Sequence, residues 1–526
     1  SVQKGNGGQP AMLSALSTET VVHKTRRVPW LLAAVSTLAL HTILVAGDVA
    51  AVAAESEAVA AASMLQCKTE RKTEANRPTM TNGYMAHTAQ EIPSTRPYWQ
   101  ELKNVGELSY TADIVVGNQT LSGILDTGSY ELLLFSRKCH ACGTAGMYEP
   151  LPSEDFSRLT VRHQHSFGSG DTESIGAVDR VLLGGHGVDE QFFWEVVDAN
   201  MPLLMEAEFN AIVGMGPPEV PLEDAIFLAG ELDELLKRYR RQTTEAMGQE
   251  IQNAYRLRDV LLRSPSLIEN MGCTRFSHCL LRQPGAPGYW IWDDESAKDK
   301  LGTFKEIPVL GEVSWGVNLS RVGWSGGVND SNKGFACQDG CAALFDSGTS
   351  LIAAPTEVVY AASQELDRIG GNCERLEELP DLVMDFGGTE LRLPPWSYAA
   401  QVSGEVPPEL RKHFPNLPPV YRACEIMMMT MDSQTQFGPL WIFGLPFFRE
   451  YYTTFDFGEY PSSREKRSIH VARSSDACLP VPWNSSHLVT YSGTTAGRVR
   501  HVDLSKLRIS PSVHKMLRQG PDVQRV

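Results

Sequence analysis

The sequence has few cysteines for its length, no excess of positive charge and only one long apolar run. Ten cysteines in 526 residues are too few for a fold held together by disulfides alone. Lys and Arg total 47 against 63 Asp and Glu, a net charge of −16. That balance argues against nucleic acid as a partner, because phosphate binding needs a basic face. With 42% hydrophobic residues the chain is too apolar to be disordered, and its length predicts two domains.

Motifs for metal binding are also scarce. The sequence has no His-Glu-x-x-His, the pattern of zinc peptidases. Cys139 and Cys142 have the spacing of zinc ligands, but a structural zinc site needs a second pair of ligands and no second Cys-x-x-Cys occurs. We therefore expect no metal site and no cofactor.

The single long apolar run covers residues 28–47, which carry no formal charge. Lys24, Arg26 and Arg27 precede it, and small residues follow. This order is typical of a secretory signal peptide, and the length also permits a membrane anchor. Either interpretation predicts entry into the secretory pathway, whether the protein is then secreted, vesicular or held on a membrane.

Composition divides the chain into five parts. Residues 1–54 hold the signal or anchor, and residues 55–97 form a polar leader or pro-segment, as in a zymogen. Residues 98–299 and 300–480 alternate short apolar runs with Gly, Asp and Ser, which predicts an all-β core in two lobes. Residues 481–526 are polar, and we expect a mobile tail.

One block, residues 222–263, interrupts the strand pattern. It lacks proline, and apolar residues recur at helical spacing: Leu228, Leu232, Leu235, Leu236, Ile251, Ala254, Leu257 and Leu261. The opposite faces are dense in charged residues. We expect one or two surface helices within the first lobe, with a solvated charged face; a partner-binding face is the alternative.

Two similar motifs lie in the two halves of the β region. Residues 124–129 read Ile-Leu-Asp-Thr-Gly-Ser, and residues 344–349 read Leu-Phe-Asp-Ser-Gly-Thr. One Asp-Ser-Gly alone is an ordinary turn, but two in matching places are hard to ascribe to turns. Each places an Asp, Asp126 or Asp346, at the end of a buried strand, where an isolated charge is costly. These two residues are the strongest candidates for a chemical role.

With these motifs the chain resembles the pepsin family (A1) of aspartic proteases over residues 98–475. The segments that carry the resemblance, in order, are Phe167-Gly168-Ser169-Gly170, 179–185, 209–218, 276–292, the Cys-Gln-Asp-Gly-Cys loop at 337–341, 440–457 and 468–474. The resemblance implies an all-β, bilobal fold with the active-site cleft between the lobes. It also implies a monomer acting on protein or peptide substrates.

The resemblance assigns roles to individual residues. Asp126 and Asp346 would be the catalytic pair, with Thr127 and Ser347 bracing their loops. The residues expected to line the substrate site are Gly128, Ser129, Phe167, Gly168, Ser169, Gly348, Thr349 and Ser350. Ser129 and Thr349 would also donate hydrogen bonds to the outer carboxylate oxygens.

Two residues depart from the family pattern. Phe167 stands where the family's flap has tyrosine, and Leu133 stands where it has the supporting tryptophan. Both members of that hydrogen-bonded pair are replaced together, so neither polar group is left unpaired. We expect a flap closed by apolar packing, with neutral drift as the alternative. Phe167 and the inserted helices also resemble plasmepsin-like enzymes of apicomplexan type.

Export would allow disulfides and glycosylation. The expected disulfides are Cys337–Cys341, Cys373–Cys424, Cys273–Cys279 and Cys139–Cys142, leaving Cys67 and Cys478 over. The acceptor sequons are Asn118, Asn318, Asn329 and Asn484.

Together these observations predict an aspartic endopeptidase in an acidic secretory or endolysosome-like compartment. The alternative is a catalytically silent pseudo-protease that serves as a secreted binding module. Such proteins usually lack one Asp motif, and both motifs are intact here.

Overall fold

The computed structural model describes residues 97–503, except 151–155, 168–169, 202–203, 205–206, 240–244, 301, 326–333, 406–417, 459–465 and 484–498. The predicted signal or anchor at 28–47, nearly all of the leader at 55–97, and Cys67 lie outside the described residues. Within the described part of the chain, no helix is both long enough and apolar enough to cross a membrane.

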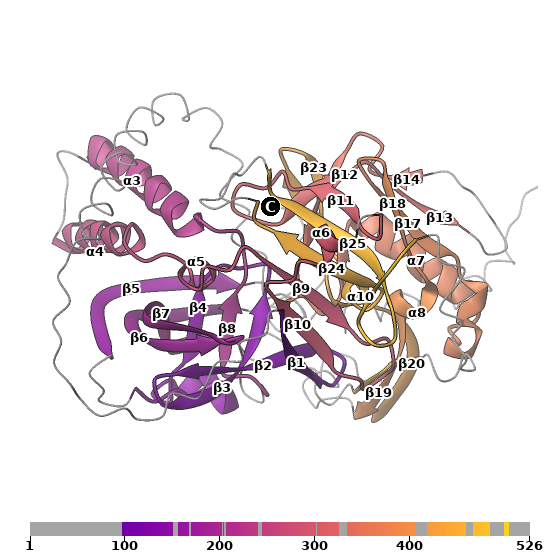
Figure 1. Ribbon diagram of the computed structural model, residues 1–526, viewed down its shortest axis with the longest axis horizontal. Coiled ribbons are helices and arrows are strands. Elements are labelled where there is room, and N and C mark those ends of the chain that lie inside the picture. Colours follow the sequence, from indigo (N-terminus) through magenta and orange to yellow (C-terminus); the bar gives the residue numbers. More distant parts are fainter. Residues whose placement is uncertain are drawn as a thin grey trace, which may run out of the picture.

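The fold is all-β and bilobal, as the sequence predicted (Figure 1). The first lobe is built from one set of strands paired into a continuous sheet, in the order β1-β2-β3-β8-β4-β7-β6-β5. The strands are β1 (Tyr98–Val105), β2 (Ser109–Val116), β3 (Gln119–Asp126), β4 (Leu132–Phe135), β5 (Ser157–Phe167), β6 (Gly170–Leu183), β7 (His186–Asn200) and β8 (Ala211–Gly214).

The same sheet continues past β1 into strands that join the two lobes. These are β10 (Gly288–Trp292), β9 (Arg275–Leu280), β24 (Tyr451–Asp456), β25 (Ser468–Ser474) and β11 (Lys305–Pro308), with β26 (Pro480–Val481) beside β25. Strands β9 and β24 pair antiparallel, with Thr453 opposite His278. Because β24 comes from the end of the second lobe and β9 from the end of the first, this pairing ties the lobes through backbone hydrogen bonds.

The second lobe holds three smaller sheets, ordered β12-β15-β23-β16-β21, β14-β13-β17-β18 and β20-β19-β27. Its strands are β12 (Gly316–Leu319), β13 (Arg321–Ser325), β14 (Gly334–Ala336), β15 (Cys341–Phe345), β16 (Ile352–Ala354), β17 (Asp381–Phe386), β18 (Thr389–Leu393), β19 (Ala399–Glu405), β20 (Val420–Ile426), β21 (Met428–Thr430), β22 (Gln434–Thr435), β23 (Gly438–Phe443) and β27 (His501–Asp503). The helices α7 (Thr356–Arg368), α8 (Pro395–Tyr398) and α10 (Leu445–Phe448) accompany them.

The strands that carry the two Asp motifs repeat one topology in both lobes. In the first lobe β3 runs parallel to β8, and β4 runs antiparallel to β8. In the second lobe β15 runs parallel to β23, and β16 runs antiparallel to β23. Asp126 ends β3 and Asp346 directly follows β15, so the two motifs leave equivalent strands.

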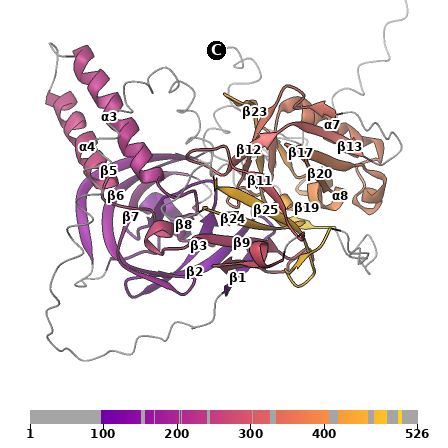
Figure 2. The ribbon, with the colours of Figure 1, turned by 45° about the horizontal axis from the view of Figure 1, so that its top comes forward.

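The expected helical block is a pair of helices, α3 (Val220–Tyr239) and α4 (Glu245–Leu261), followed by the short α5 (Leu267–Asn270). Figure 2 shows α3 and α4 side by side above β5. The side chain of Asn253 in α4 exchanges hydrogen bonds with the backbone of Arg162 in β5. Leu257 is buried in the same core cluster as Trp194. The apolar face of α4 therefore covers the outer strand of the first lobe.

Part of the C-terminal segment that we expected to be mobile belongs to the fold. Strand β27 pairs parallel with β19, and the preceding Arg500 is buried. The Arg500 guanidinium lies 2.6 Å from the Glu107 carboxylate, which also lies 3.2 Å from Arg449. Burial alone would raise the pKa of Glu107, but the two guanidinium charges and the hydrogen bonds that it accepts outweigh burial and lower this pKa. This segment thus closes a buried ion cluster with residues of both lobes.

Three of the four expected disulfides are present: Cys139–Cys142, Cys337–Cys341 and Cys373–Cys424. The expected Cys273–Cys279 bond is wrong, because Cys279 bonds to Cys478. Cys279 lies on β9 in a small core with Ile291 and Cys478, whereas Cys273 lies before that strand in the main core. The buried Cys273 thiol donates instead to the Arg275 carbonyl.

Replacing Cys279 and Cys478 together by Ala should lower the unfolding temperature more than replacing Cys139 and Cys142 together. The first bond joins residues 199 apart and the second joins residues 3 apart. Closing a longer loop removes more entropy from the unfolded chain, so the first loss should be about 2–5 kcal/mol. Calorimetry of the two double variants checks this, and equal losses would contradict it. Non-reducing peptide mapping checks the pairing itself.

Candidate active site

The two Asp side chains are fully buried at the ends of strands from different lobes. Asp126 and Asp346 are each 0% exposed. The Met215 amide donates to the Asp126 carbonyl at 2.7 Å, and the Asp346 amide donates to the Phe443 carbonyl at 3.0 Å. The first bond ties Asp126 to the residue that follows β8, and the second ties Asp346 to the last residue of β23. Each Asp is therefore held at the end of the strand that runs parallel to its own.

Each carboxylate accepts one backbone and one hydroxyl hydrogen bond from its own loop. The Gly128 amide donates to Asp126 Oδ1 at 2.9 Å, and the Ser129 hydroxyl donates to Oδ2 at 2.6 Å. The second loop repeats this pattern at matching positions, with Gly348 to Asp346 Oδ1 at 2.8 Å and Thr349 to Oδ2 at 2.6 Å. The hydroxyl bonds from Ser129 and Thr349 are those expected from the sequence.

Thr127 and Ser347 brace the two loops against each other. The Thr127 hydroxyl donates to the Phe345 carbonyl at 2.9 Å, and the Ser347 hydroxyl donates to the Leu125 carbonyl at 2.6 Å. Each hydroxyl also accepts the other residue's amide N–H, at 3.0 Å from the Thr127 amide and 2.9 Å from the Ser347 amide. Four hydrogen bonds thus cross between the lobes directly beneath the carboxylates.

Gly128 and Gly348 leave room for the opposite carboxylate. A Cβ added to Gly128 would lie 2.7 Å from the Asp346 carboxyl carbon, and one added to Gly348 would collide with Asp126. A side chain at either position would force the carboxylates apart. Contact of both glycines with substrate, which we expected from the sequence, stays a prediction; the structure shows that each lies against the opposite Asp carboxylate.

The pKa of Asp126 is raised well above its ordinary value. Burial is the largest cause, followed by the charge of Asp346 and a hydrogen bond to it. The bonds from Ser129 and Gly128 act in the opposite direction, because they stabilise the ionised form. The pair therefore holds a proton that a solvent-exposed carboxylate would release, and titration belongs to the pair as a unit.

The other expected substrate residues fall in different places. The Ser350 hydroxyl is buried and donates to the Leu108 carbonyl, so it is engaged within the protein. Phe167 pairs with Gly170 at the tip of the β5–β6 hairpin, which we call the flap hairpin (residues 157–183). Gly168 and Ser169 lie outside the described residues.

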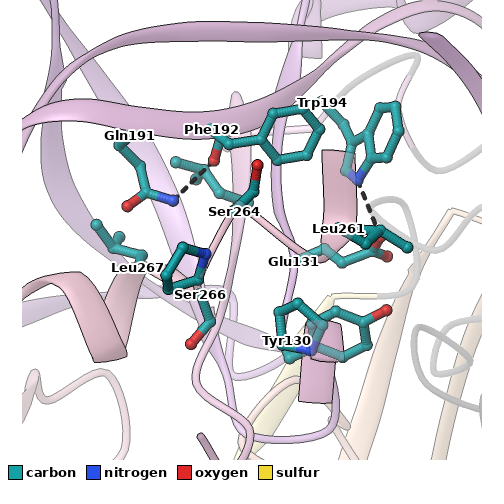
Figure 3. A pocket seen from close by; sticks show the side chains of 12 residues that line it. Tyr130, Glu131, Gln191, Phe192, Trp194, Leu261, Ser264, Ser266 and Leu267 are labelled. Atoms are coloured by element: carbon teal, nitrogen blue, oxygen red, sulfur yellow. Dashed lines mark hydrogen bonds between the residues drawn. The ribbon is translucent and has the colours of Figure 1, made fainter. Parts of the chain in front are cut away.

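Sequence reasoning missed Trp194 and Glu131. Leu133 stands where the family has tryptophan, and it is paired in parallel register with Trp194 of β7. The Trp194 indole donates to Glu131 Oε1 at 2.9 Å (Figure 3). An indole from a neighbouring strand therefore lies beside the position that lost one. No local signal marks this, because it depends on which residues β4 and β7 place opposite each other.

A pocket lies beside this pair, where the end of the helical insertion meets the first Asp loop (Figure 3). Its lining comes from the loop and the first residue of β4, from β7, from the start of α3, and from the stretch that runs from the end of α4 to the start of α5. The lining residues are Tyr130, Glu131, Leu132, Gln191, Phe192, Trp194, Pro221, Leu261, Ser264, Pro265, Ser266 and Leu267. The Asp pair is not among them, so this pocket is distinct from the dyad.

Known proteins match this arrangement. The family model for eukaryotic aspartyl proteases matches residues 109–242 and 274–463. The chain belongs to this family. Bovine pepsin A is 24% identical over 68% of this chain and 84% of its own length, and human cathepsin D is 26% identical over 72% and 85%. Sheep renin is 25% identical over 68% and 79%.

The family assignment makes the chain an aspartic endopeptidase that acts on peptide or protein substrates. The stretch between the two matched segments, 243–273, contains α4 and α5. The part of the insertion that packs on β5 therefore lies outside the segments that the family model matches.

Replacing Thr127 by Ala should destabilise the protein, whereas Thr127→Ser should be nearly neutral. Alanine removes the hydroxyl that bonds to Phe345 and leaves the Ser347 amide without its partner. Losing a buried partner costs about 1–3 kcal/mol. Urea unfolding measures the difference between the two variants. Equal stability of the alanine and serine variants would contradict a bracing role for the hydroxyl.

Proposed function

We propose that Asp126 and Asp346 are the catalytic pair of this endopeptidase and that they activate a water molecule for attack on the peptide bond. The single observation that carries the proposal is the burial of two carboxylates against each other, each held by its own loop. Two carboxylates this close favour sharing one proton. General acid–base catalysis requires such a pair, because one member must accept a proton and the other must donate one.

Burial against Asp346 raises the pKa of Asp126, and the pair shares one proton between a protonated and an ionised member. The ionised member takes a proton from water, whose oxygen attacks the peptide carbonyl carbon. The protonated member donates its proton to the carbonyl oxygen, and collapse of the tetrahedral intermediate passes a proton to the leaving amine. Peptide bond and water are consumed, a carboxyl and an amine form, and the pair returns to its one-proton state.

We further infer that the enzyme works in an acidic compartment of the secretory pathway. Four disulfides among the described residues support an oxidising environment. Mild acidity keeps the shared proton on the pair. The apolar segment at 28–47 supplies the signal or anchor in this account.

Replacing Asp126 by Asn should abolish peptide cleavage, with a fall in kcat of at least about 10²–10⁴. Asparagine keeps the size of the side chain but cannot supply the shared proton. Cleavage of a peptide library at acid pH gives the measurement, with Asp113→Asn, an exposed carboxylate of β2, as the matched control. Activity that survives the change at Asp126 would refute the pair. A wild-type protein that binds peptides but never cleaves them would identify a pseudo-protease.

The same variant should be more stable than wild type at neutral pH but not at strongly acid pH. The folded-state pKa of Asp126 is raised, so the folded protein holds a proton that the unfolded chain releases above about pH 4. Ionisation of Asp126 therefore lowers the free energy of unfolding of the wild type as pH rises. The Asp126→Asn variant does not lose stability in this way, because its amide does not titrate. Unfolding temperatures of both proteins between about pH 3 and 7 measure the difference. A difference in unfolding temperature between the two proteins that does not grow as pH rises would contradict the raised pKa of Asp126.

Phe167, at the tip of the flap hairpin, should set substrate preference through apolar packing. Phe167→Tyr adds a hydroxyl where Leu133 has replaced the family's tryptophan, so it should change kcat/KM unequally among substrates. Profiling the variant on the same peptide library tests this. Unchanged kinetics across several substrates would indicate neutral drift instead.

A further inference from the structure

Three possible metal ligands converge near the tip of the flap hairpin. Glu131, His163 and His165 each offer one ligand atom, and these atoms lie within 4.8 Å of one another. The two histidines occupy alternate positions of β5, so their side chains leave the same face of the strand. Glu131 comes from the segment between the first Asp motif and β4. The cluster thus joins two separate elements.

Neighbouring residues hold two of these side chains in place. The Ser174 hydroxyl lies 3.2 Å from His165 Nδ1, and the Trp194 indole donates to Glu131 Oε1 at 2.9 Å. The remaining ring nitrogen, His165 Nε2, lies 3.2 Å from Glu131 Oε1. Outer contacts of this type orient metal ligands and fix which ring nitrogen is available.

The ion pair between Glu131 and His165 explains the position of those two side chains but not that of His163 beside them. The His163 ring lies edge-on to His165, at 4.6 Å between centroids, and tilted against Trp194 at 5.4 Å. Two imidazoles and a carboxylate around one point form the donor set that transition metals favour over Ca²⁺ or Mg²⁺, which prefer oxygen ligands.

We propose that Glu131, His163 and His165 bind a divalent transition-metal ion, with Zn²⁺ the best match. Two nitrogen ligands and one carboxylate leave a fourth tetrahedral position open. This revises our expectation from the sequence that the chain has no metal site. The histidine pair was visible in the sequence, but its carboxylate partner comes from a different part of the chain.

The bound ion would fasten the flap hairpin to the first Asp loop. His165 is two residues before Phe167 at the hairpin tip, and Glu131 is five residues after Asp126. Because a metal bridge resists separation of its ligands, occupancy would restrain opening of the hairpin. The effect on cleavage rests on the proposed function of the Asp pair, whereas binding of the ion does not.

Binding is tested with the full-length protein titrated at neutral pH with Zn²⁺ against a chromophoric chelator, and with Co²⁺, whose visible spectrum reports tetrahedral coordination. Glu131→Gln, His163→Asn and His165→Asn should each lose one bound equivalent. Trp194→Phe, which removes the orienting indole N–H together with part of the buried ring, should weaken binding about 10–100-fold. His186→Asn is the matched control, because His186 pairs with Asp293 at 3.1 Å outside this cluster. It should bind as wild type does.

If wild type and all three ligand variants bind Zn²⁺ with the same stoichiometry and affinity, the proposed site is wrong. It is also wrong if His186→Asn loses as much bound Zn²⁺ as the ligand variants do. Glu131→Gln guards against misfolding, because its amide oxygen can still accept the Trp194 bond. Hydrogen exchange of residues 157–175 should slow on adding Zn²⁺ to wild type and not to His165→Asn. If the protein binds the ion but cleaves no peptide, the proposed function fails while the metal site stands.

Discussion

Two carboxylates that would be costly to bury singly are buried against each other where the lobes meet, and much of the surrounding structure serves that contact. Glycines at 128 and 348 leave the space, and the hydroxyls of Thr127 and Ser347 lock the loops from beneath. The repeated strand topology brings each Asp to the same depth from its own side. The raised pKa of Asp126 is the electrostatic consequence of this packing.

Features that depend on neighbouring residues in the chain could be predicted from the sequence. The all-β lobes, the two Asp motifs, the helical insertion and the short disulfide loops follow from local patterns. The partner of Cys279 could not be predicted, because it depends on which face of β9 the side chain takes and on the small core shared with Cys478. The ordered Arg500 was missed for the same reason, since its partners Glu107 and Arg282 are distant in the sequence.

This chain departs from the family pattern near the tip of the flap hairpin. Trp194 lies opposite Leu133 on the paired strand, and α4 covers β5 from outside. The indole anchors Glu131 beside two histidines of the same hairpin. The substitution at Phe167, the inserted helix α4 and the Glu131–His163–His165 cluster all involve strand β5. We therefore expect this strand to set the regulation and the substrate preference of the enzyme.

The central claim is that the two carboxylates share one proton during catalysis. The pH dependence of kcat/KM for a single peptide substrate tests it most directly, because the profile reports the ionisations of the free enzyme. A shared proton predicts a bell-shaped profile with an acid limb and an alkaline limb, one for each macroscopic titration of the pair. A profile with a single limb, or one that stays flat across the acid range, would contradict it.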